Sequence, residues 1–339
     1  MKKSIMISMV MVLFSLVFSG FMSPVLAENK PMVLKMVTFL PDVKPGNVWP
    51  HLLVKKVATI SKGELVVKII GGPESIPMSD TTMAVKNEVI DIASIVTVFA
   101  ESTVPGIEIL GLGEYSSKEI RNNGTLDVFK EMCAKAGLYL MGTAVPSDAQ
   151  KMQCFFLKKE ITSIDELKGL KIASPGGLQS AFIEALGAVC IPIAYPDFYT
   201  AMERGAVDGY VHGVPGIMDF GLEPVTGFML EELFTSPTNG FFMNLKKYNS
   251  LPQKYKGYLN QASAEVDEEG AVIFNQLIDH VKKEIGKKGV KVGKFSHEES
   301  VKFYKLYRQS MTADTLKRNP DIFPKMQKIV QNPDFYRLK

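Results

Sequence analysis

The stretch from 163 to 213 constrains the fold most, because short apolar runs alternate in it with helical patterns. Ser163 and Glu166 have the spacing of a capping box, so a one-turn helix is expected before Gly169. Strands are expected at 170–172, 188–193 and 207–211, with helices at 178–186 and 197–204 between them. Strands separated by helices favour right-handed crossovers and a parallel sheet.

The loops that follow parallel strands gather at one edge of the sheet, where ligands usually bind. Here these loops carry Ala173 and Ser174 after the first strand, Tyr195 after the second and His212 after the third. The topology therefore predicts a binding site at this edge, and none of these residues is an obvious catalyst.

This stretch also resembles a known family. DELKGLKI at 165–172, ALGA at 185–188 and DFYTAMERGAVDG at 197–209 are similar to the signature of TRAP-type (tripartite ATP-independent periplasmic) solute-binding proteins of the DctP family. Similar text at 60–72, 84–95 and 244–256 extends the resemblance along nearly the whole chain.

The resemblance implies an α/β fold of the two-lobed periplasmic binding protein type, with a ligand cleft between the lobes and a long helix spanning both. It also implies an extracytoplasmic receptor that captures a small organic solute by cleft closure. Such a receptor delivers its solute to TRAP membrane permease subunits driven by an ion gradient. An exported enzyme on a similar two-lobed fold, or a subunit that presents its ligand to a sensor, is the alternative.

One position departs from the family pattern. Relatives usually carry an Arg directly after the KI of the first strand, where it pairs with the carboxylate of the solute, and this chain has Ala173. A methyl group cannot replace the two parallel hydrogen bonds of an Arg. Either Lys151, Ser174, His212 or backbone amides hold a carboxylate instead, or the solute is neutral or has an aromatic or apolar portion.

The amino terminus has the pattern of a signal peptide over residues 1–27. Lys2 and Lys3 precede an apolar core at 5–21, and small residues end at Ala27. Cleavage after Ala27 and a periplasmic location are therefore expected, with a membrane anchor as the alternative reading of this stretch.

Composition excludes some function classes. The chain has 39 Lys and Arg against 36 Asp and Glu, a formal net charge of +3, which is not the charge of a nucleic-acid-binding protein. It lacks the common motifs for a nucleophile, a catalytic metal or a phosphate loop. We therefore expect no catalytic activity, no metal and no cofactor. A monomer is also expected, although the sequence does not fix the oligomeric state. Cys133, Cys154 and Cys190 are too scattered for a disulfide framework, although pairing of two of them stays open.

The family resemblance also suggests how the chain is divided. Lobe I is expected to comprise 28–148 and 238–270, and lobe II 149–237 and 271–339. Apolar residues at helical spacing predict a helix over about 252–285. At 1.5 Å per residue it would be about 50 Å long, longer than one domain is wide, so it is expected to cross both lobes.

The remaining elements follow from local patterns. Strands are predicted at 32–39, 64–70, 90–96, 139–143 and 234–245, and helices at 48–60, 79–88 and 121–136.

Four candidate site residues lie in the predicted first lobe. Trp49 follows the first strand and is read either as a ring that stacks on the solute or as the first core residue of the next helix. Thr97 and Phe99 come after a strand whose loop faces the solute in the family, with a core role as the alternative for Phe99. Asn239 lies where the chain returns to the first lobe.

Candidates also lie in and after the first crossing between the lobes. Relatives have a second solute-binding Arg there, and this chain offers Lys151 and Gln153, with a solvated lysine as the alternative for Lys151. His212 occupies the place of a ligand-contacting Asn in the family, and a role in capping backbone groups is its alternative. Tyr195 is expected to place its hydroxyl in the cleft.

Overall fold

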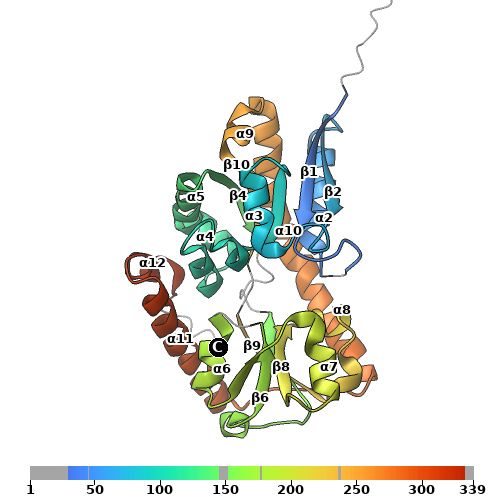
Figure 1. Cartoon of the computed structure of the whole chain (residues 1–339), viewed down its shortest axis with the longest axis vertical. Helices are drawn as coiled ribbons and strands as arrows, with labels where there is room; N and C mark the ends of the chain where they lie inside the picture. Colours follow the sequence, from blue (N-terminus) through green and yellow to red (C-terminus); the bar gives the residue numbers. More distant parts are fainter. Residues whose placement is uncertain (1–29, 45, 145–151, 176–177, 236–237, 333–339) are drawn as a thin grey trace, which may run out of the picture.

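The computed structural model describes residues 30–44, 46–144, 152–175, 178–235 and 238–332. These residues form two β-sheets with helices packed on both faces, and Figure 1 shows one sheet above the other. The predicted signal peptide at 1–27 and Lys151 lie outside the described residues.

The first sheet has the strand order β2-β1-β3-β10-β4. Its strands are β1 (Met32–Thr38), β2 (Leu65–Gly71), β3 (Ile92–Val96), β4 (Leu138–Ala144) and β10 (Asn239–Asn244). Strands β2 and β3 are parallel to β1, whereas β10 is antiparallel to β3 and β4. Successive side chains of a strand point to opposite faces. Phe241 accordingly packs in the cluster that contains α2 (Val48–Ile60), and Phe242 in the cluster that contains α5 (Thr125–Lys135).

The second sheet has the order β11-β9-β5-β8-β6-β7. Its strands are β5 (Gln153–Leu157), β6 (Lys171–Ser174), β7 (Val189–Pro192), β8 (Gly209–Gly213), β9 (Phe228–Thr235) and β11 (Lys291–Gly293). The predicted parallel unit is present, because β7 and β8 both pair with β6 in parallel. Strand β5 joins this unit antiparallel to β8 and β9. Helix α6 (Leu178–Ala185) packs on one face of this second sheet, and α7 (Phe198–Glu203) packs on the other.

A single helix, α10 (Gln253–Lys287, 35 residues), passes both sheets, as predicted. Its first half packs on α2 and β4, and its end reaches β11. Gly270 lies at the middle of this path, where a Cβ atom would stand 2.6 Å from Cδ1 of Trp49. The absence of a side chain at this position therefore lets the Trp49 ring lie against the helix backbone.

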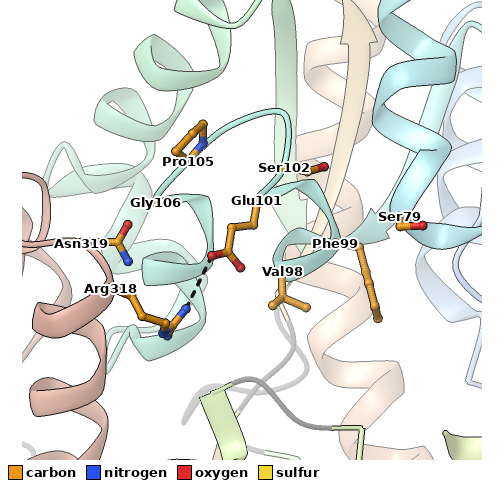
Figure 2. A pocket seen from close by; sticks show the side chains of 9 residues that line it. All are labelled: Ser79, Val98, Phe99, Glu101, Ser102, Pro105, Gly106, Arg318 and Asn319. Atoms are coloured by element: carbon orange, nitrogen blue, oxygen red, sulfur yellow. Dashed lines mark ion pairs between the residues drawn. The ribbon is translucent and has the colours of Figure 1, made fainter.

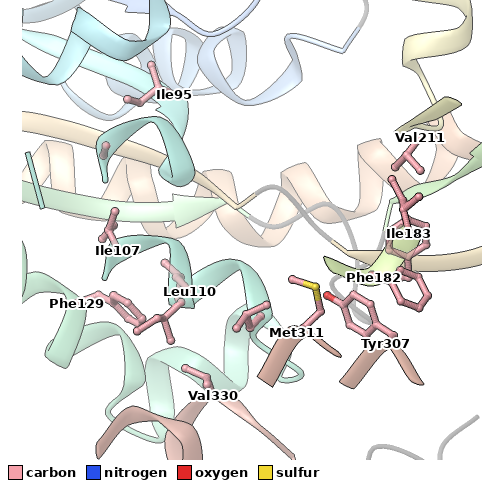
Figure 3. Close-up of a cluster of buried hydrophobic side chains, with 14 of the residues drawn as sticks. Ile95, Ile107, Leu110, Phe129, Phe182, Ile183, Val211, Tyr307, Met311 and Val330 are labelled. Atoms are coloured by element: carbon pink, nitrogen blue, oxygen red, sulfur yellow. The ribbon is translucent and has the colours of Figure 1, made fainter. Parts of the chain in front are cut away.

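The last two helices run alongside both sheets. Helix α11 (His297–Arg318) packs on α6, and α12 (Phe323–Val330) packs on the 3-10 helix η3 (Ile107–Leu112) beside the first sheet. Figure 3 shows Tyr307 and Met311 of α11 between the apolar side chains of the two halves. One buried cluster thus continues from the first sheet's helices to the second sheet.

Helix α12 packs beside the first sheet, although 271–339 was predicted to belong to lobe II. The predicted boundaries near 148 and 238 adjoin 145–151 and 236–237, which lie outside the described residues. The exact lobe boundaries therefore stay a prediction.

Two predicted elements are corrected by the structure. The helix expected at 121–136 is two helices, α4 (Ser117–Asn122) and α5, because Gly124 between them has a φ of +82°. The strand expected at 234–245 is the end of β9 and the whole of β10, which belong to different sheets. Strand β5 was not predicted.

Other local expectations agree closely. Ser163 and Glu166 form the predicted capping box at η4 (Ile164–Leu167), and α2 has the predicted bounds. The three cysteines are free thiols. Among the described residues, no helix is long and apolar enough to cross a bilayer.

Candidate functional site

Strand β4 of the first sheet is followed in sequence by β5 of the second, and β9 of the second by β10 of the first, so we take the sheet edges at these four strand ends as the ones that face each other. On the first sheet, the end of β4 and the start of β10 adjoin the crossings, and β1 and β3 end on the same side. On the second sheet the start of β5 and the ends of β9, β8 and β6 lie on the crossing side. We call these two sides the facing edges.

Three uncharged polar side chains are joined by hydrogen bonds at the facing edge of the second sheet. The Ser174 hydroxyl donates to Gln179 Oε1 over 2.7 Å, and Gln179 Nε2 donates to Gln153 Oε1 over 2.5 Å. Ser174 and Gln153 are buried, and Gln179 is half-buried in the first turn of α6. The structure thus brings together two of the predicted site residues through a third that was not predicted.

Aromatic side chains surround His212 at the same edge. The ring centroid of Tyr195 lies 4.3 Å from that of His212, that of Phe220 5.3 Å and that of Phe198 6.1 Å. Tyr195 also shares a hydrogen bond with the Gln179 side chain, while burial raises the pKa of its hydroxyl to about 12. Tyr195 therefore connects the hydrogen-bonded side chains of Ser174, Gln179 and Gln153 to the aromatic rings around His212.

His212 is held in one tautomer by its neighbours. Its Nδ1 lies 3.2 Å from the carbonyl oxygen of Gly213, and because a carbonyl oxygen only accepts, Nδ1 carries the proton. Burial lowers the pKa of His212 to about 4, against a smaller opposite effect of this hydrogen bond. The ring is therefore neutral at neutral pH, and Nε2 is an acceptor. A Cβ atom on Gly216, the first residue of α8 (Gly216–Asp219), would stand 1.9 Å from Nδ1, so only glycine leaves room for the ring.

Ala173 lies fully buried in the face of β6 that points toward α7. It shares a buried cluster with Phe198 and Tyr210, and Tyr195 packs against this cluster. The space that a long side chain at position 173 would need is thus filled by aromatic residues.

Two predicted residues of the first lobe, Thr97 and Asn239, lie together at its facing edge. Thr97 begins the 3-10 helix η2 (Thr97–Ala100), and its backbone N–H donates to the carbonyl oxygen of Thr238 over 2.9 Å. Asn239 Nδ2 donates to the Ser94 hydroxyl over 3.1 Å. Both side chains are buried, so this edge presents uncharged groups held by the sheet itself.

A pocket of about 610 Å³ opens beside this edge, between η2 and the end of α11. Figure 2 shows that Phe99 and Val98 line one side and Arg318 the other. Arg318 Nη1 lies 3.6 Å from Glu101 Oε1 and 3.5 Å from Glu108 Oε1, and its Nε lies 2.8 Å from Asp314 Oδ2. Three carboxylates thus lie around this one guanidinium, whose side chain is 30% exposed.

The loop after β1 reaches across to the second sheet's helices. Lys44 Nζ donates to the carbonyl oxygen of Asp219 in α8, and the backbone N–H of Gly46 donates to the Asp219 carboxylate. Burial raises the pKa of Asp219 to about 6, although both contacts favour its charged form.

Trp49 does not lie among the other candidates. It is 2% exposed and stacks on Phe274 of α10 with a centroid distance of 4.9 Å. In this conformation it has the core position that was the alternative to ligand stacking.

A sequence comparison places the chain among known proteins. The sequence profile of the bacterial extracellular solute-binding proteins of family 7, named DctP, matches residues 46–314. The chain belongs to the DctP family. The family and fold class that the sequence predicted are confirmed.

Individual relatives of this DctP-family protein are distant. The outer membrane transporter protein TsaT of Comamonas testosteroni is 27% identical over 143 residues, which are 40% of this chain and 41% of TsaT. A monocarboxylate 2-oxoacid-binding periplasmic protein of Nostoc is 30% identical over 115 residues, 33% of this chain and 31% of the relative. The match thus spans less than half the length of either relative.

The fold of this DctP-family protein is also found in solved structures. A TRAP periplasmic solute-binding protein from Desulfovibrio salexigens, with bound orotic acid, has a TM-score of 0.76 at 17% identity. The likeness covers 90% of this chain and 99% of that one. At this identity it shows the fold alone.

Sequence reasoning missed three residues of this candidate site. Gln179 joins Ser174, Gln153 and Tyr195, and its only signal in the sequence was a polar side chain in the first turn of the helix that follows the first strand of the parallel unit. Phe220 and Asp219 come from α8 and the residue after it, a short element without a clear sequence pattern. No group of three or more His, Cys, Asp or Glu among the described residues is placed to hold a metal ion.

Proposed function

We propose that this protein is the extracytoplasmic solute-binding receptor of a TRAP transporter. It captures a small organic solute, an organic acid or a compound with an aromatic or apolar part, between its two lobes. Contacts that the solute makes with both lobes at once shift the population toward the closed state. The receptor then delivers the solute to the membrane permease subunits, which an ion gradient drives.

The observation that carries this proposal is the arrangement of the facing edges. Polar and aromatic side chains lie at the strand ends of both facing edges. They include Thr97 and Asn239 on the first sheet and Gln153 and His212 on the second. A solute held there contacts both lobes. Family membership and the fold shared with a receptor that binds orotic acid support the same role.

We further infer that the protein is exported to the periplasm with cleavage after Ala27, acts as a monomer and returns its solute unchanged. The signal pattern at 1–27 supports export. Membership in a family of solute-binding proteins supports binding rather than turnover.

Native mass spectrometry of the freshly purified protein, followed by a thermal-shift screen of organic acids, aromatic compounds and neutral solutes, tests the binding role. A solute at one hundred times its Kd should add about 2.7 kcal/mol of stability. Small-angle scattering should then show closure with the same solute, and recovered solute should be chemically unchanged. Uptake by membranes that hold the permease subunits should require the receptor. Absence of any bound solute and of closure would overturn the proposal.

A further inference from the structure

Three cations near the facing edges, Arg318, Lys44 and Arg308, each have a partner within the protein. Arg318 lies against three carboxylates, as described, and Lys44 donates to the backbone of Asp219. Arg308 of α11 pairs with Glu114. At position 173, where the family's solute-binding Arg would stand, the chain has a buried alanine. Lys44 is a cation beside the aromatic rings of this site, since its Nζ lies 5.8 Å from the Phe220 ring centroid, but it donates to a carbonyl oxygen and does not stand at position 173.

The groups that do line the second sheet's facing edge are flat or uncharged. Tyr195, Phe220 and His212 present rings, and Gln153, Gln179 and Ser174 present amides and a hydroxyl. Rings provide a large contact area for a planar molecule, and amide and hydroxyl groups suit neutral donors and acceptors. A charged solute group placed against them would lose hydration without gaining an opposite charge.

His212 determines whether the solute group should donate or accept a hydrogen bond. Its proton lies on Nδ1, and its Nε2 is buried and has no hydrogen-bond partner among the described residues. A buried acceptor without a partner costs free energy. A solute N–H or O–H group that bonds to Nε2 removes this cost, so it gains more binding free energy than a group that bonds to a protein atom already in a hydrogen bond. A carboxylate is an acceptor only and cannot satisfy Nε2, whereas an N–H or O–H group can.

We propose that the solute's buried end is an uncharged planar group that donates an N–H or O–H hydrogen bond to His212 Nε2. This inference rests on the proposed receptor function and names the solute class of that site. The Tyr195 ring covers part of His212, so the solute reaches Nε2 when this ring turns aside and then packs on the solute's face. When Tyr195 turns aside, its hydrogen bond with the Gln179 side chain opens, and Gln179 supplies a second polar contact to the solute.

Matched sets of three compounds separate charge from donor capacity. Each set carries one aromatic or heteroaromatic ring as its carboxylate, its primary amide and its N,N-dimethylamide, for example benzoate, benzamide and N,N-dimethylbenzamide. Isothermal titration with the full mature chain measures each Kd. At least one primary amide should bind about tenfold or more tightly than its carboxylate and than its dimethylamide, the loss expected for one hydrogen bond to a buried acceptor.

Three variants assign the donor's partner. His212→Phe keeps a ring without an acceptor and should lose about tenfold in affinity for the primary amide, with the dimethylamide unchanged. His212→Gln retains an acceptor oxygen and should recover part of the loss. His280→Phe, at an exposed histidine of α10, should change neither affinity. Thermal unfolding of each free variant shows whether it is folded.

The outcomes separate this inference from the receptor function. Tighter binding of the carboxylates, equal loss of both amides in His212→Phe, or binding only of organic acids outside these sets would overturn the inference and leave the receptor function standing. Failure of every solute in these sets and in the broad screen would overturn both.

Discussion

Lys44 follows β1 of the first sheet, Asp219 lies in α8 after β8 of the second, and a hydrogen bond joins the lysine Nζ to the aspartate carbonyl oxygen. The Gly46 backbone N–H, two residues further along the same loop, donates to the Asp219 carboxylate. The loop after β1 therefore contacts the second sheet's helices at a carboxyl group that burial makes hard to ionise.

Asp219 is expected to make stability depend on pH. The pKa of an unfolded aspartate is about 3.9 and that of folded Asp219 about 6, so the folded chain binds more protons between these values. Its contribution to the free energy of unfolding therefore falls as the pH rises from about 4 to about 6 and stays constant above. A difference of about 2 pH units corresponds to at most about 3 kcal/mol.

Asp219→Asn should remove this dependence. Urea unfolding at pH 4 and pH 7 should show the variant gaining stability relative to the native chain at the higher pH, by up to about 3 kcal/mol. Asp321→Asn, at an exposed aspartate, serves as the control and should show almost no such change. Parallel behaviour of Asp219→Asn and the native chain across this range would show that Asp219 ionises normally.

Gly270→Ala should destabilise the protein even though alanine is the better helix former. The new Cβ atom would stand 2.6 Å from Trp49 Cδ1, and overpacking of a buried site costs about 1–3 kcal/mol. Gly257→Ala in the same helix has no atom within 4 Å of its new Cβ and should stabilise by up to about 1 kcal/mol. Opposite signs for the two variants in thermal unfolding confirm the packing argument, and two gains in stability would contradict it.

Ala173→Arg should not restore carboxylate binding. Position 173 is fully buried among aromatic residues, and an unpaired buried charge costs about 3–5 kcal/mol. Ala134→Arg, on the exposed side of α5, should change stability by less than about 0.5 kcal/mol. A well-folded Ala173→Arg protein that gained affinity for small carboxylates would mean that the site keeps the geometry usual in the family.

Arg121 contacts two carboxylates of α10 that differ in exposure. Its Nη1 lies 2.6 Å from Asp267 Oδ2, whose side chain is 2% exposed, and its Nη2 lies 3.3 Å from Glu268 Oε1, whose side chain is 70% exposed. Arg121→Ala should therefore cost about 3 kcal/mol, because it takes the counter-charge from a buried carboxylate. Glu268→Ala should cost less than about 1 kcal/mol in the same urea unfolding assay. Equal losses would show that burial of Asp267 has no effect.

Local patterns were enough to predict several elements. The bounds of α2, the capping box of Ser163 and the length of α10 depend on residues close in sequence, so spacing and capping reveal them. Strand β5 was not predicted because its apolar run is short, and it forms a strand by pairing with β8 and β9, which lie far along the chain. The break at Gly124 was missed because glycine is also tolerated inside helices.

The site was predictable only where strand ends define it. Ser174 ends β6, His212 is the last residue but one of β8, and Tyr195 follows β7, so the topology of one parallel unit placed all three on one edge. The partner of each side chain was not predictable. The hydrogen bonds through Gln179, and the burial of Trp49 between α2 and α10, depend on side-chain packing between elements that the sequence does not pair.

The unbroken course of α10 along both sheets has a mechanical consequence. Elements of both sheets pack on this one helix of 35 residues. The proposed closing motion therefore requires α10 to bend or the sheets to slide along it. In the proposed closure, bending of α10 would favour the open state once the solute leaves. The stiffness of this one helix would then set how much of the solute's contact energy appears as affinity and how much is held as elastic strain.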